Sequence, residues 1–201
     1  KDYNWMMDFT EKLLEFCAIQ VNGTTKATFG EHEIDFKAPY PRVSMTEAIL
    51  KFTGFDITGK SEQELFDFAK SIGIEVNETM GKGKLIDEIF GEKCEGNFIQ
   101  PTFITDYPIE MSPLTKKHRS KEGLTERFEL MVCGKEIANA YSELNDPIDQ
   151  RERFEDQLKL SEKGDDEAGQ FIDEDFLRAL EYGMPPTSGL GIGMDRLIMF
   201  L

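Results

Sequence analysis

The chain contains 201 residues and carries a formal net charge of −16, from 23 basic and 39 acidic residues. This charge opposes tight nonspecific binding to nucleic acid. No run of about 18 apolar residues occurs, so no membrane-spanning helix is expected. A hydrophobic content of 39%, with 16 Phe, is sufficient for one domain, or for one domain with a small inserted lobe.

Cysteine and histidine are sparse. The three cysteines, Cys17, Cys94 and Cys133, are widely spaced and form no Cys-x-x-Cys pair, which is typical of reduced thiols in the cytosol. His32 and His118 are too few and too far apart for a zinc site, so we expect both at the surface.

Hydrophobic periodicity, turn residues and helix caps predict both helices and strands. Two capping boxes, Ser44 to Glu47 and Ser61 to Glu64, indicate where two of the helices begin. The expected elements, in chain order, are a helix over 4–21, a hairpin over 24–36, helices over 44–52, 61–72 and 84–90, a strand over 98–105, two strands within 127–146, helices over 146–163 (with an acidic exit at 164–168) and 173–182, and an extended segment and helix start within 189–201.

The two helices of 61–95 are linked by a basic, glycine-rich stretch. This stretch, Gly81-Lys-Gly-Lys84, lacks the spacing of a Walker phosphate loop, so we do not interpret it as one. Helices packed on an antiparallel sheet would give the chain an α+β fold.

The segment from Arg127 to Asp146 predicts two strands joined by a tight turn at 133–135. A solvated hairpin face is the simple interpretation of its many polar residues. The intervening positions are small or apolar, which indicates a buried strand instead. The polar residues are therefore candidates for a binding site: Glu129, Glu136, Asn139, Tyr141 and Glu143.

Strand parity complicates this site. A three-residue turn would pair Val132 with Glu136 and place Glu129 on the face of Asn139. Glu136 lies three residues before Asn139 and then has the wrong parity to join them. We therefore predict a bulge near 137–138 that re-aims Glu136, or a Glu136 side chain that reaches the face from the end of the turn.

The end of the chain combines alternate glycines with an arginine. Gly189, Gly191 and Gly193 leave one edge of an extended segment without side chains, so a flat ligand can lie against bare backbone. Arg196 follows at the start of an apolar run typical of a helix, where its planar guanidinium can stack on an aromatic base.

Residues 185–201 (Pro-Pro-Thr-Ser, then Gly-Leu-Gly-Ile-Gly-Met-Asp-Arg and an apolar run) resemble the third signature motif of class II aminoacyl-tRNA synthetases. Residues 134–146 (Gly-Lys-Glu-Ile-Ala-Asn-Ala-Tyr-Ser-Glu-Leu-Asn-Asp) resemble the lysine-specific members of that class. Residues 23–26, 40–48 and 100–105 extend the resemblance over nearly the whole chain.

This resemblance implies an antiparallel sheet flanked by helices, with a small helical insertion, and ATP-dependent activation of lysine for transfer to tRNA(Lys). Arg196 would act in catalysis by stacking on the adenine of ATP. The residues implied to bind ATP are Glu129, Glu136, Ile137, Gly193 and Arg196, of which Glu129 and Glu136 would hold Mg²⁺. The residues implied to bind lysine are Asn139, Tyr141, Glu143 and Gly191.

The implied roles agree with the chemistry of these side chains. Magnesium prefers carboxylate and phosphate oxygens, and in-line attack on a phosphate needs positioning and charge stabilisation more than acid or base catalysis. Glu143 is a natural counter-charge for the ε-ammonium of lysine. Tyr141 offers a ring face for the side chain, and Asn139 would bond the polar backbone end of the amino acid.

The resemblance also implies an organisation for the chain. Residues 1–60 and 96–201 would be parts of a catalytic domain, and 61–95 the insertion. The anticodon-binding domain and the first two motifs would lie outside this chain, so we expect it to be inactive alone. The parent enzyme would be a cytoplasmic homodimer. We expect partial exposure of the apolar face in the absence of these parts, at Phe103, Phe128 or Tyr141.

Two alternatives and one segment stay open. A related enzyme that activates lysine but modifies a protein would share these motifs. A noncatalytic interaction module would share the fold but lose the site residues, which are present here. The basic cluster at 116–121 is either a solvated loop or, as in the family, a contact for phosphates of ATP or the tRNA end.

Overall fold

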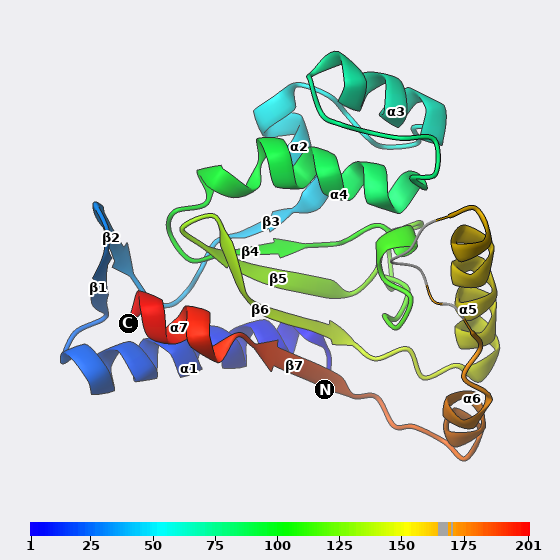
Figure 1. Ribbon diagram of the computed structural model, residues 1–201. Helices are drawn as coiled ribbons and strands as arrows, with labels where there is room; N and C mark the ends of the chain where they lie inside the picture. The colour runs from blue at the N-terminus through cyan, green and yellow to red at the C-terminus, as the bar shows by residue number, and fades with distance from the viewer. Residues whose placement is uncertain (165–168, 170) are drawn as a thin grey trace.

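The computed structural model describes residues 1–164, 169 and 171–201, and the expected acidic exit at 165–168 lies outside the described residues. A five-stranded sheet in the order β3-β4-β5-β6-β7 forms its centre (Figure 1). The β3–β4 pair, at one edge, is parallel and the other three pairs are antiparallel. The predicted α+β fold, a sheet flanked by helices, is confirmed.

The strands are β1 (Lys26–Phe29), β2 (His32–Asp35), β3 (Arg42–Ser44), β4 (Thr102–Thr105), β5 (Arg127–Val132), β6 (Lys135–Ser142) and β7 (Ser188–Ile192). The α-helices are α1 (Tyr3–Asn22), α2 (Met45–Thr53), α3 (Glu62–Ser71), α4 (Lys82–Lys93), α5 (Pro147–Glu162), α6 (Glu174–Glu181) and α7 (Met194–Phe200). Two 3₁₀ turns, η1 (Glu95–Asn97) and η2 (Ile109–Met111), complete the described elements.

The predicted helix boundaries follow from local chemistry. Both capping boxes are present, with Ser44 and Ser61 each accepting from the backbone N–H three residues on. Gly23 ends α1 in the left-handed conformation (φ 72°), which glycine adopts without a Cβ penalty. Helix α4 is longer than predicted at both ends, because residues 82–83 and 91–93 continue it.

The two faces of the sheet pack differently. Phe103, Phe128 and Leu130 point to one face and join the apolar side chains of α1, α7 and the β1–β2 hairpin in one core. Ile104 and Met131 point to the other face and join a second core formed with α2, α3 and α4. In Figure 1 these three helices lie over the β3–β4 side of the sheet, and α5 and α6 lie beyond one end of the strands.

The expectation of exposed aromatic residues on the sheet was wrong for Phe103 and Phe128, which are both fully buried. Their rings pack edge to face with centroids 4.9 Å apart, and residues of α1 such as Leu14 cover the same core. Tyr141 is partly exposed, as expected.

Two further expectations were wrong. The His118 side chain is only 8% exposed, because its Nε2 lies 3.2 Å from the Tyr3 hydroxyl and 3.7 Å from a carboxylate oxygen of the buried Asp106. The strand expected over 98–105 begins only at Thr102. The Phe98 carbonyl instead accepts a hydrogen bond from the β5–β6 turn.

Cys17, Cys94 and Cys133 all fall in the described part of the chain and are free thiols there. None of the described helices is both long enough and apolar enough to cross a membrane.

Candidate functional site

Polar side chains and glycines form two rows across β5, β6 and β7, on the face opposite the α1–α7 core. We call this the site face. Helices α2, α3 and α4 pack on it towards the β3 edge of the sheet, through Ile104 of β4 and Met131 of β5. The glycine of the second row on β7 is exposed. From β5 to β7 the paired residues of the two rows are Arg127, Tyr141 and Gly189, then Glu129, Asn139 and Gly191.

The β5–β6 turn is one residue shorter than predicted. Cys133 and Gly134 form a two-residue turn in which both φ angles are positive, 49° and 65°. Val132 therefore pairs with Lys135 and not with Glu136. Two-residue hairpins favour this conformation because its twist matches that of the strands.

Because the turn is one residue shorter than predicted, β6 contains one extra residue, which forms a bulge inside the strand. The register shifts between Leu130 and Met131, so that Ile137 has no partner and Met131 pairs with Glu136. Met131 and Glu129 are two residues apart on β5 and share a face, so Glu136 shares it too. The predicted irregularity at this point is confirmed. The Ile137 side chain is buried in the opposite core, which leaves its backbone on the site side.

Glu129 and Glu136 bring two carboxylates to the site face. Burial raises the pKa of the Glu129 carboxyl, Arg127 opposes that shift, and the negative charge of Glu136 adds to it. Two neighbouring carboxylates of this kind fit the needs of a magnesium ion that also binds substrate phosphates. Within the described residues, no group of three or more His, Cys, Asp and Glu side chains could hold a metal by itself.

Glu143 lies beyond the end of β6 and reaches back over β7. Its Oε1 lies 2.6 Å from the position that a Cβ on Gly189 would occupy, so only glycine leaves room for the carboxylate here. Burial raises the pKa of the Glu143 carboxyl, and the Gly189 backbone N–H opposes the shift. The carboxylate is half-buried and can attract a cation.

Tyr141 belongs to the first row of the site face and lies between Glu143 and Asn139 along the chain. Its hydroxyl pKa is raised by burial first and by the charge of Glu143 second. The register places Tyr141 opposite Gly189, so its ring borders the bare backbone of β7. Tyr141, Glu143 and Gly189 therefore form one end of the site.

Arg196 lies at the other end, in the first turn of α7. It is exposed, and its guanidinium donates to the Glu136 carbonyl over 2.5 Å. Beside it is an open hollow of about 410 Å³, with a floor that includes Gly191 and Gly193. The Gly193 N–H donates to the Ile137 carbonyl, which ties the start of α7 to the bulge.

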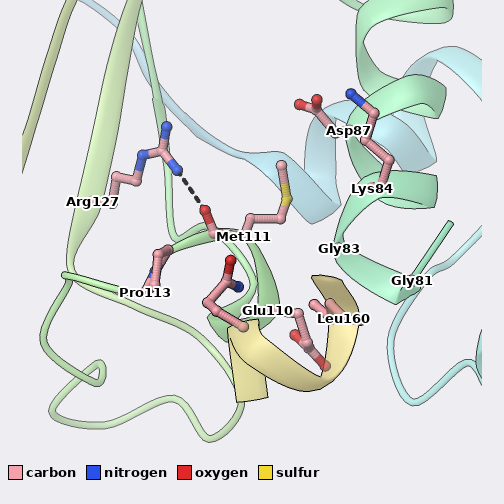
Figure 2. A pocket seen from close by; sticks show the side chains of 10 residues that line it. Gly81, Gly83, Lys84, Asp87, Glu110, Met111, Pro113, Arg127 and Leu160 are labelled. Atoms are coloured by element: carbon pink, nitrogen blue, oxygen red, sulfur yellow. Dashed lines mark hydrogen bonds between the residues drawn. The ribbon is translucent and has the colours of Figure 1, made fainter. Parts of the chain in front are cut away.

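Arg127 is a residue of the site to which the sequence pattern gave no role. Its guanidinium donates to Glu129 (2.5 Å) and to Asn139 (3.3 Å), two of the predicted ligand-binding residues. It also forms part of the wall of a second hollow, of about 280 Å³, between α4, η2 and α5 (Figure 2). Its position two residues before Glu129 on one strand was the available signal.

The basic cluster at 116–121 is held by partners within the chain. It links the start of α1, the residues before β5 and the start of α5. The pairs are Lys116 with Asn145, Lys117 with Asp149, Arg119 with Asp2 and Glu126, and Lys121 with Asp106.

The family model described as "tRNA synthetases class II (D, K and N)" matches residues 1–201. The chain therefore belongs to the class II tRNA synthetases.

Three relatives of the chain are named lysine–tRNA ligases. Over all 201 residues the chain is 82% identical to the lysine–tRNA ligase of Christiangramia forsetii and 73% identical to that of Porphyromonas gingivalis. It is 64% identical to the lysine–tRNA ligase of Azobacteroides pseudotrichonymphae. The chain spans 35% of the length of the first two relatives and 40% of the third.

Proposed function

We propose that this chain is part of the catalytic domain of a lysine–tRNA ligase and that its site face binds lysine and ATP side by side. One observation carries the proposal: Glu143 and Arg196 lie at opposite ends of a glycine-floored surface. Along β6 these ends are roughly 20 Å apart, at 3.3 Å per residue. The names of the relatives support the same assignment.

The lysine end is formed by Glu143, Tyr141, Asn139 and Gly191. Glu143 would pair with the ε-ammonium, and the half-buried position strengthens that pairing compared with one in bulk water. A buried counter-charge also provides selectivity, because a substrate without the ammonium leaves the carboxylate without a partner. Asn139 would bond the polar backbone end of lysine, at the centre of the site face.

The ATP end is formed by Arg196, Gly193, Glu136 and Glu129. The Arg196 guanidinium would cover an adenine ring laid on the glycine floor. Glu129 and Glu136 would hold a magnesium ion, which supplies neutralisation of charge on the triphosphate. The backbone of Ile137, held by the bulge, lines the same hollow.

The reaction that suits this arrangement is attack of the lysine carboxylate on the α-phosphorus of ATP, which breaks the bond from that phosphorus to the oxygen bridging to the β-phosphate, releases pyrophosphate and forms lysyl-adenylate. The chain's residues would align the two substrates, and alignment accounts for a large part of such rate enhancements. We further propose tRNA(Lys) as the acceptor, a cytoplasmic homodimer as the full-length enzyme, and residues 61–95 as a small insertion in a catalytic domain formed by 1–60 and 96–201.

Calorimetric titration of the full-length protein with lysine and with magnesium-ATP tests the proposal. Glu143→Gln should weaken lysine binding about 10-fold to 100-fold, the value of a hydrogen bond to a charged group. Arg196→Ala should weaken magnesium-ATP binding about tenfold through loss of stacking. Each variant should leave the other ligand's affinity unchanged. Failure of the unmodified protein to bind either ligand would contradict the proposal.

A further inference from the structure

The Arg127 guanidinium is held on two sides, by residues outside the site and by residues of the site. Its side chain is only 16% exposed, and the guanidinium lies 4.4 Å above the ring of the buried Tyr107. On the side away from the site, its Nη1 donates to the Met111 carbonyl and to the Ser112 hydroxyl, each over 3.1 Å. Figure 2 shows Arg127 extending from β5, with the Met111 bond dashed.

On the side of the site, Arg127 closes a triangle with Glu129 and Asn139. Its Nη2 donates to Oε1 of Glu129, and its Nε donates to Oδ1 of Asn139. Asn139 in turn donates from Nδ2 to the same Oε1 of Glu129, over 3.4 Å. Both of these hydrogen bonds to Glu129 end on one oxygen, and the Asn139 amide has its oxygen towards Arg127.

We propose that Arg127 is a positioning residue that fixes the Glu129 carboxylate and the Asn139 amide relative to each other. The inference rests on the proposed function, because it concerns how that site holds its two substrates. Glu129 belongs to the magnesium-ATP end and Asn139 to the lysine end. Arg127 therefore connects a residue of the magnesium-ATP end with a residue of the lysine end.

Geometry distinguishes this role from charge neutralisation alone. A guanidinium is planar and presents several donors in fixed directions, so it can direct two acceptors at once. A lysine ammonium carries the same charge but has no such fork. The Tyr107 ring and the Met111 and Ser112 acceptors hold the guanidinium plane on the opposite side. Arg127→Lys therefore keeps the charge and removes the orientation.

Arg153 provides a matched control. It also forms a carboxylate pair, with Asp149, and its Nη1 donates to the Ile109 and Ser112 carbonyls of the same 109–112 segment that Arg127 holds. Among the described residues, Arg153 forms its hydrogen bonds and its ion pair with Ile109, Ser112 and Asp149, and not with Glu129 or Asn139. Arg153→Lys thus perturbs the same segment without touching the site.

The test is calorimetric titration of the full-length protein and its Arg127→Lys and Arg153→Lys variants with magnesium-ATP, with magnesium at a fixed ATP concentration, and with lysine. Thermal denaturation of each variant reports folding. We expect Arg127→Lys to weaken magnesium-ATP binding about 10-fold to 100-fold, as for residues that orient a metal ligand. Lysine binding should weaken as well, and Arg153→Lys should bind both ligands as the unmodified protein does.

Each outcome has one meaning. If the unmodified protein binds neither ligand, the proposed function fails. If it binds both and Arg127→Lys binds them equally well, charge alone is sufficient and the positioning role is overturned. If Arg127→Lys and Arg153→Lys lose affinity to the same extent, the effect is structural and the role is also overturned. If Arg127→Lys does not fold, Ser112→Ala, which removes one anchor of the guanidinium, replaces it and should weaken magnesium-ATP binding severalfold.

Discussion

Replacing Gly189 by alanine should separate ligand binding from stability. The new Cβ would lie 2.6 Å from Oε1 of Glu143, closer than atoms in contact can approach. The atom it meets is the end of a flexible side chain, so the Glu143 carboxylate moves and the backbone does not. The displaced Glu143 carboxylate is then no longer in position to pair with the ε-ammonium of lysine.

The substitution should raise the stability of the fold slightly and lower its affinity for lysine by a larger free energy. The φ angle of Gly189 is not in the left-handed region, so alanine there reduces the entropy of the unfolded chain and stabilises the fold by about 0.4–1 kcal/mol. A charged hydrogen bond contributes about 1.5–3 kcal/mol. Glu143 is half-exposed, so the lower value applies, which corresponds to about a tenfold loss of lysine affinity.

Calorimetric titration with lysine and thermal denaturation of the full-length protein measure both effects. Gly91→Ala, in α4, is the control, because a Cβ there meets nothing within 4 Å. It should leave lysine affinity unchanged. Unchanged lysine affinity in Gly189→Ala would refute the reasoning that this glycine positions Glu143.

Four further predictions concern the pH dependence of lysine affinity, the pH dependence of stability, the core and the turn. Because burial raises the pKa of Glu143 above its ordinary value of 4.5, lysine affinity should fall as the pH falls towards that raised pKa, and Glu143→Gln should abolish this dependence in titrations from pH 8 to pH 5. The folded state disfavours the ionised Glu143, so stability is lost as pH rises through the raised pKa. Glu143→Gln should therefore raise the Tm at pH 8 but not at pH 4; a lower Tm at pH 8 would contradict the sign. Phe128→Ala should cost about 3–5 kcal/mol in the free energy of unfolding, since the ring is fully buried, and a denaturant titration showing less than 1 kcal/mol would be inconsistent with the described core. Gly134→Ala should cost about 1–2 kcal/mol, because a left-handed φ of 65° is strained for alanine and its Cβ would lie 3.1 Å from the Cα of Gly96; an unchanged Tm would contradict the two-residue turn.

Local sequence signals were sufficient for most of the helices. The capping boxes at Ser44 and Ser61 define where α2 and α3 begin, and Gly23 defines the end of α1. These features act within one turn of the chain, so the sequence carries them directly. The grouping of Glu129, Asn139 and Tyr141 on one face was also predictable, because the period of a strand is two.

The turn and bulge show where sequence patterns are insufficient. Parity required an irregularity near Glu136 but could not locate the turn, because Cys133 is a non-glycine residue with a positive φ. The two-residue turn and the bulge at Ile137 compensate each other. The pairing of Glu129 with Asn139 is therefore the one that a three-residue turn would also produce.

Contacts between distant segments could not be predicted. The Arg127 guanidinium is anchored by Met111 and Ser112, and the Glu143 carboxylate depends on a missing side chain at Gly189, 46 positions along the chain from it. His118 is enclosed because Tyr3, 115 positions earlier, approaches its ring. Such relationships depend on the packing of the fold and not on local periodicity.

The most direct test of the account is a crystal structure of the full-length protein with lysine and a non-hydrolysable magnesium-ATP analogue. The account predicts the ε-ammonium within hydrogen-bonding distance of Glu143 and the adenine against the Arg196 guanidinium, on the site face. Lysine bound elsewhere, or an adenine ring away from Arg196, would contradict it.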